Sequence, residues 1–192
     1  FYSVLVRWFP RCRIMMALMK ITESALNLPR GFFDSCFERP GTTLRLAYYP
    51  AIANVPSKAT VGTRYRYGKH TDYDAYTLLW RPEGDSELEI MMKNGKWQSV
   101  VAPPDSLTIN IGDLLARWTN DRWRATPHRV AMPRDRSKSR LSVVYFTGPH
   151  PDTTVACLPS SKCREGGAKY DPITASEHVR LKIARSFAHA KK

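Results

Sequence analysis

The pattern of hydrophobic and polar positions changes once along the chain, at about residue 40. Residues 13–26, RIMMALMKITESAL, place apolar side chains three and four positions apart without glycine or proline, which predicts an amphipathic helix. The stripe expected to face the core consists of Ile14, Leu18, Ile21 and Leu26. The methionines of this segment are expected to fill gaps in the same core. Pro29 and Gly31 are expected to end the helix.

From about Gly41 onward, short β-rich runs alternate with turn sequences. The runs are TTLRLAYY, YTLLW, LEIMM, WQSVVA, SLTINIG, HRVAM and RLSVVYF. The Asn-Gly pair in KNGKW is a hairpin signal between two of them. Turns about every ten residues favour an antiparallel sandwich or barrel over alternating βα units. After Pro149, the segment TASEHVRLKIARSFA predicts a closing helix, with Thr174 as its N-cap and Glu177 completing a capping box.

Composition adds limits to this picture. A chain of 192 residues with 43% hydrophobic and 24% charged residues can build one globular domain. Its apolar runs are short and broken by arginine, so we expect no membrane span, which needs about 20 apolar residues. Four cysteines without C-x-x-C spacing predict free thiols in a reducing compartment, and hence a cytoplasmic protein.

The net charge of +13 is concentrated in part between residues 117 and 140. Such a basic stretch can grip phosphate backbones, form a solvated face, or attract small dicarboxylates. Aromatic residues do not interleave with the basic ones in a recognisable nucleic-acid module, so a nucleic-acid partner is not favoured.

A candidate metal site begins at the triplet His70-Thr71-Asp72. Residues two apart in a strand project from the same face, so His70 and Asp72 would point into one space. His128, at the entry of a later β-like run, would supply a third ligand if the two strands lie side by side. Two imidazoles and one carboxylate leave three coordination positions open, an arrangement typical of non-haem Fe(II) oxygenases. Zinc is the competing metal.

Arg140 and Ser142 share one face of the last predicted strand. An arginine inside a barrel is costly unless it meets an anion, and its planar fork matches a carboxylate. A dicarboxylate that chelates iron at one end and meets Arg140 at the other would use both features. By the same alternation, Val144 and Phe146 would face inward and line the apolar part of the pocket.

Several ordered segments resemble the isopenicillin N synthase-like Fe(II)/2-oxoglutarate oxygenases. They are LRLAYYP, GKHTDYDAYTLLW, NGKWQSVVAPPDSLTINIGDLLARWTNDRWRATPHRV and RLSVVYFTGPHPD. The resemblance implies a mainly β fold, the double-stranded β-helix or jelly roll, with flanking N-terminal and C-terminal helices. It implies that most of the family's N-terminal region is absent. The expected division is a helical remnant of that region at 1–40, the jelly-roll domain at 41–150, and an extension with a helix at 151–192.

The resemblance also assigns roles to single residues. His70, Asp72 and His128 match the family's iron ligands. Arg140 and Ser142 match the Arg-x-Ser pair that holds the distal carboxylate of 2-oxoglutarate.

A further match at Tyr49 and two departures from the family pattern complete the comparison. Tyr49 matches the tyrosine of an Asn-x-Tyr motif that contacts 2-oxoglutarate, although Ala47 replaces the asparagine. The pair at 86–87, Ser-Glu, stands where the family usually has Gly-Gly.

The implied activity is oxidation of a small organic substrate, by hydroxylation or desaturation, with Fe(II), 2-oxoglutarate and O2, releasing succinate and CO2. Ascorbate is a candidate stimulant. One alternative is an oxidase of the same fold that does not use 2-oxoglutarate, as in isopenicillin N synthase. The other is a non-catalytic, truncated jelly-roll binding module. The sequence indicates neither the substrate's identity nor the oligomeric state.

Overall fold

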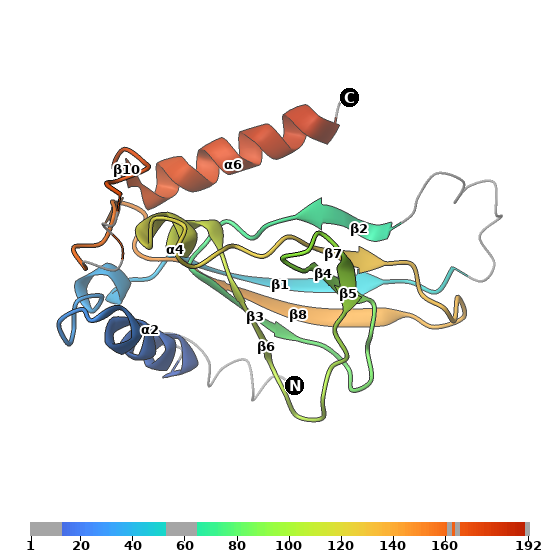
Figure 1. Cartoon of the computed structure of the whole chain (residues 1–192). Helices are drawn as coiled ribbons and strands as arrows, with labels where there is room; N and C mark the ends of the chain where they lie inside the picture. Colours follow the sequence, from blue (N-terminus) through green and yellow to red (C-terminus); the bar gives the residue numbers. More distant parts are fainter. Residues whose placement is uncertain (1–12, 53–64, 161–162, 164–165, 191–192) are drawn as a thin grey trace.

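Two antiparallel four-stranded sheets form the centre of the computed structural model, which describes residues 13–52, 65–160, 163 and 166–190 (Figure 1). The first sheet has the order β1 (Thr42–Tyr49), β8 (Arg140–Thr147), β3 (Tyr76–Trp80), β6 (Thr108–Ile111). The second has the order β2 (Tyr65–His70), β7 (His128–Ala131), β4 (Leu88–Met91), β5 (Trp97–Ser99). Most neighbouring strands are distant in sequence, so the chain crosses repeatedly between the sheets. The fold is the expected double-stranded β-helix.

The predicted N-terminal helix is present as α2 (Arg13–Leu26), but its buried stripe differs from the prediction. Met15 and Met19 are fully buried, whereas Ile21 is 62% exposed, so its assignment to the core was wrong. The buried side passes instead through Thr22 and Glu23. Polar residues can occupy it because they find hydrogen-bond partners there.

Local contacts explain both the polar stripe and the end of α2. The Glu23 carboxylate accepts the backbone N–H groups of Gly31 and Phe33 at 3.0 and 3.1 Å. The helix ends one residue before Asn27, which adopts a left-handed conformation with φ of 56°. The N–H of Leu28 then reaches the carbonyl of Glu23 at 2.9 Å, which closes a Schellman-type C-cap.

The hydrophobic core lies at one end of the first sheet, against α2, the short helix η1 (Ser35–Phe37) and α4 (Asp113–Trp118). Phe33 and Trp118 meet there with ring centroids 5.2 Å apart. Because the helices cover only this end, the space between the two sheets further along stays available for a cavity.

Two local predictions about turns and caps are confirmed. The β4–β5 hairpin closes over Asn94-Gly95, where Gly95 has φ of 77° and the N–H of Met92 donates to the carbonyl of Lys96 at 2.8 Å. Helix α6 (Ala175–Ala190) begins directly after Thr174, the predicted N-cap, whose Oγ1 accepts the N–H of Glu177 at 3.2 Å.

The C-terminal part of the chain runs beside the end of α4 that carries Asp113. Strands β9 (Thr154–Val155) and β10 (Ile173–Thr174) form a small antiparallel pair that leads into α6. Lys182 of α6 forms an ion pair with Asp113 at 2.7 Å, which ties the closing helix to α4 (Figure 1). The carboxylate of Glu177 pairs with Arg180 at 2.7 Å on the exposed side of the same helix.

Cysteines and helix lengths agree with the compositional expectations. Cys36, Cys157 and Cys163 are free thiols, and Cys12 lies outside the described residues. Among the helices in the described ranges, none is long and apolar enough to cross a lipid bilayer.

Candidate metal centre

A cavity of about 240 Å³ lies between the two sheets, and both groups of candidate residues line it. One end is marked by a row of contacts in which Arg45 lies over the ring of Tyr67, 5.4 Å from its centroid, and Tyr67 meets the ring of His70 at 4.5 Å. Arg45 pairs with Val144 across β1 and β8, whereas Arg140 lies four residues earlier, at the start of β8. At the rise of a strand, the backbone of Arg140 therefore lies about 13 Å from that of Val144, so the two groups of residues line different parts of the cavity.

The two histidines face each other across hydrogen-bonded neighbouring strands. His70 ends β2, His128 begins β7, and the register of the two strands pairs them directly, with ring centroids 4.2 Å apart. In each ring, Nδ1 lies 2.9 or 3.0 Å from the backbone carbonyl two residues earlier, at Gly68 and Thr126. A carbonyl only accepts, so Nδ1 carries the proton and the Nε2 lone pair stays free to bind a metal.

Asp72 reaches the histidines by a different route from the one predicted. Strand β2 ends at His70, so Asp72 lies in the loop before β3 and strand alternation does not place it. The loop is held against the start of α4, where the N–H of Asp113 donates to the carbonyl of Asp72 at 2.8 Å. Gly112 permits this close packing, because a Cβ atom there would lie 2.1 Å from the carbonyl oxygen of Asp74.

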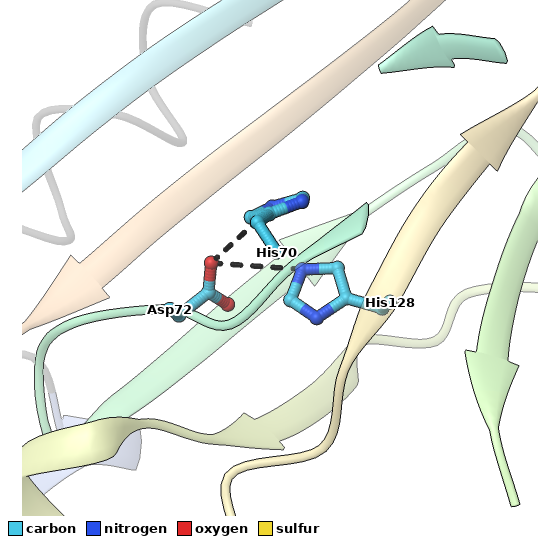
Figure 2. A group of neighbouring side chains, drawn as sticks. All are labelled: His70, Asp72 and His128. Atoms are coloured by element: carbon cyan, nitrogen blue, oxygen red, sulfur yellow. Dashed lines mark ion pairs between the residues drawn. The ribbon is translucent and has the colours of Figure 1, made fainter. Parts of the chain in front are cut away.

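The Asp72 carboxylate has one oxygen engaged and one turned to the histidines. Its Oδ2 accepts Thr77 Oγ1 and Asn110 Nδ2, both at 2.7 Å. Its Oδ1 lies 3.8 Å from Nε2 of His70 and 3.6 Å from Nε2 of His128 (Figure 2). These separations are too long for good hydrogen bonds, and one ligand atom from each residue lies within 4.8 Å of the others. The cluster has the donor atoms and spacing of a metal site.

The sequence prediction missed Thr77 and Asn110, although a signal was present. Both are polar positions within apolar β runs, YTLLW and TINI. The Asn110 side chain contacts Asp72 and lines the cavity, so its polarity marks the inner face of β6.

The protonation state of His70 favours metal binding. Burial, reinforced by the neighbouring His128, lowers the pKa of His70, which favours its neutral imidazole form. Burial and the charge of Asp72 raise the pKa of Asp74 to about 6. A neutral imidazole can bind a divalent cation, and two His with one carboxylate is the facial set used by non-haem Fe(II).

The arginine end of the cavity is also as the alternation predicted. Arg140 and Ser142 are 5% and 2% exposed, and Nη1 of Arg140 lies 3.4 Å from Oγ of Ser142. The guanidinium carbon of Arg140 lies 5.1 Å from the centroid of the Tyr49 ring. Val144 and Phe146 line the cavity.

Two acidic residues beside Arg140 were not foreseen. Asp85 Oδ2 lies 2.5 Å from Nε of Arg140, and Glu87 Oε2 lies 3.8 Å from the same nitrogen. Another residue of the basic stretch, Arg129, pairs with Glu89 at 2.5 Å. Part of the positive charge of this stretch is therefore compensated inside the fold.

Comparison with known proteins decides the family. The model of the 2OG-Fe(II) oxygenase superfamily matches residues 40–149, more than half of the chain. The chain belongs to this superfamily. Among curated proteins, it is 30% identical to the 2-oxoglutarate-Fe(II) type oxidoreductase ppzC of Metarhizium majus over 191 residues, which cover 97% of this chain and 50% of the relative. It is 30% identical to the proline hydroxylase buaE of Petromyces alliaceus over 195 residues, which cover 97% of this chain and 60% of the relative.

Solved structures of this oxygenase superfamily agree with the fold. A full-length Neurospora crassa protein in complex with alpha-KG, which is 2-oxoglutarate, superposes with a TM-score of 0.84 at 29% identity. The superposition covers 96% of this chain and 57% of that one. The oxygenase chain described here thus spans about half the length of the curated relatives it matches.

Proposed function

We propose that this chain is the iron- and 2-oxoglutarate-binding part of a dioxygenase that oxidises a small organic substrate, by hydroxylation or desaturation, with O2, releasing succinate and CO2. One observation carries the proposal. A cluster of two histidines and an aspartate and a buried arginine–serine pair line the same cavity. A metal site alone, or a buried arginine alone, would not require the other.

In this proposal, His70, Asp72 and His128 hold Fe(II). Their fit rests on the two free Nε2 lone pairs and on Asp72 Oδ1, which the hydrogen bonds to Oδ2 leave unused. Fe(II) when bound supplies the dioxygen chemistry, which amino-acid side chains cannot provide. The protein's part is to hold the three donor atoms in one geometry through hydrogen bonds to the other side of each ligand.

Arg140, Ser142 and Tyr49 bind the cosubstrate in this proposal. The guanidinium would take the distal carboxylate of 2-oxoglutarate as a fork, with Ser142 donating beside it. Val144 and Phe146, which line the same cavity, would supply apolar wall and help to exclude water from the reacting groups. Phe146 is also proposed to contact the substrate.

The substrate class rests on the relatives. A proline hydroxylase is among them, and the Neurospora crassa protein has also been solved with thymine at 28% identity and a TM-score of 0.84. Both molecules are small and organic, which suits a cavity between two sheets. We further propose that residues 41–150 form the catalytic jelly roll, that residues 13–40 form a helical segment before it, and that residues 151–190 are an extension packed on it; residues 1–12 and 191–192 of the expected division lie outside the described residues.

Iron content together with 2-oxoglutarate turnover tests the proposal. Purified protein supplied with Fe(II), ascorbate and 2-oxoglutarate should bind one iron, show a visible metal-to-ligand charge-transfer band without oxygen, and form succinate in air. His70→Ala should lose the iron and the band. His150→Ala is the matched control, because His150 lies outside the three-residue cluster. Full iron occupancy in His70→Ala, or an iron-loaded wild type without band or succinate, would refute the proposal.

A further inference from the structure

Asp85 lies between two buried arginines beside the cavity. One carboxylate oxygen lies 2.5 Å from Nε of Arg140, and the other lies 3.1 Å from Nη1 of Arg81. The side chains of Arg140, Asp85 and Arg81 are only 4%, 6% and 0% exposed. Charged side chains this deeply buried are stable only when each is paired with an opposite charge, so the position of Asp85 is coupled to that of both arginines.

The contact leaves the functional end of the Arg140 guanidinium free. Asp85 occupies the Nε edge, whereas Nη1 points to Ser142 at 3.4 Å. The Tyr49 ring provides an aromatic contact 5.1 Å from the guanidinium carbon. A guanidinium has five donors in a fixed plane, so fixing one edge also fixes the direction of the others.

The charged side chains around Arg140 carry one more positive than negative charge. Glu87 pairs with Arg66 at 3.1 Å and approaches Nε of Arg140 at 3.8 Å. Three guanidinium groups, those of Arg66, Arg81 and Arg140, thus face the two carboxylates of Asp85 and Glu87. One positive charge remains uncompensated among them, which a single ligand carboxylate would neutralise.

We propose that Asp85 is a positioning residue for the cosubstrate: it holds Arg140 by Nε so that the Nη end meets the distal carboxylate of 2-oxoglutarate. The inference rests on the proposed function, because it requires 2-oxoglutarate in this cavity. Neither the resemblance to the family nor the predicted strand pattern points to this loop residue.

Selectivity between two 2-oxoacids tests the inference. 2-Oxobutyrate has the same chelating end as 2-oxoglutarate but no distal carboxylate, so its affinity does not depend on Arg140. Asp85→Asn keeps the shape of the side chain and removes its charge. The added positive charge alone would tighten binding of the distal carboxylate, so a positioning role predicts the opposite: the affinity for 2-oxoglutarate should fall about tenfold, with that for 2-oxobutyrate within about twofold of wild type. Both constants come from anaerobic titration of the Fe(II) protein, followed by the charge-transfer band.

Two further variants complete the test. Glu83→Gln removes an exposed carboxylate from the same loop and should leave both affinities at wild-type values. If Asp85→Asn does not fold, Glu87→Gln replaces it. Its carboxylate approaches the same nitrogen from further away, so the selective loss for 2-oxoglutarate should be smaller, about threefold.

The outcomes separate this inference from the proposed function. A wild-type Fe(II) protein that binds neither 2-oxoacid refutes both. Wild-type binding of 2-oxoglutarate with unchanged or tighter binding in Asp85→Asn refutes only the positioning role. Equal loss for both 2-oxoacids in the variants would make Asp85 a purely structural residue and would also overturn the inference.

Discussion

Asn110 donates its side-chain amide to Oδ2 of Asp72 at 2.7 Å, on the side of the carboxylate that faces away from the two histidines. This bond directs Oδ1 toward the candidate metal position. Asn110→Ala should therefore lower iron affinity about tenfold, as is usual when the outer partner of a ligand is removed. Competition with a metal chelator measures the change. Asn94→Ala, on the exposed hairpin turn, should leave the affinity unaltered.

Gly112→Ala should damage the metal site from a distance. The added Cβ would lie 2.1 Å from the carbonyl oxygen of Asp74, so either α4 or the loop that carries Asp72 must move. We expect a loss of about 1–3 kcal/mol in the free energy of unfolding, together with weaker iron binding. Gly68→Ala is the control, since a Cβ atom there meets nothing within 4 Å. Equal behaviour of the two variants would contradict the packing argument.

His178 on α6 should make the free energy of unfolding depend on pH. Burial is the main cause that lowers its pKa from 6.5 to about 4; Asp113 opposes this, and Lys182, Arg117 and Arg185 add to it. Between these values the unfolded chain takes up a proton and the folded protein does not. The stability held above pH 6.5 is therefore lost as the pH falls toward 4.

The loss of stability at pH 5 can be calculated from the folded and unfolded pKa values of His178. Relative to pH 7.5, His178 should remove about 2 kcal/mol from the free energy of unfolding. Denaturant titrations of the metal-free protein at both pH values measure the change. The variant His178→Gln should show a pH dependence smaller by that amount. An identical dependence in the two proteins would exclude His178 as its source.

Two apolar positions on α2 should respond very differently to truncation. Met19 is 1% exposed and packs in the core, whereas Ile21 is 62% exposed. Met19→Ala should lower the free energy of unfolding by about 2–5 kcal/mol, whereas Ile21→Ala should change it by less than about 0.5 kcal/mol. Denaturant titration gives both values, and a larger effect at Ile21 would reverse the assignment of the buried face.

Features set by local alternation could be predicted from the sequence. In β8, Arg140, Ser142, Val144 and Phe146 all line the cavity, because side chains of a strand alternate strictly between its two faces. The N-cap at Thr174 likewise depends on residues close in sequence.

Features set by contacts distant in sequence were not predictable in the same way. Asp72 lies beyond the end of its strand, and its place depends on Gly112, forty positions later. Asp85 lies in a loop without periodicity, so nothing in its neighbours indicated a contact with Arg140. On α2, the exposure of Ile21 followed from hydrogen bonds that let Thr22 and Glu23 enter the buried face.

The direct pairing of His70 with His128 has a mechanical consequence. Strands β2 and β7 are irregular neighbours, with shifts in register on both sides of Tyr67. An ion bound by both imidazoles would act as a cross-strand staple that prevents this weak ladder from slipping. Removing the metal should therefore speed amide hydrogen exchange in β2 and β7, while the amides of α2 keep their protection. Metal occupancy would thus set the stiffness of the pocket wall as well as its chemistry.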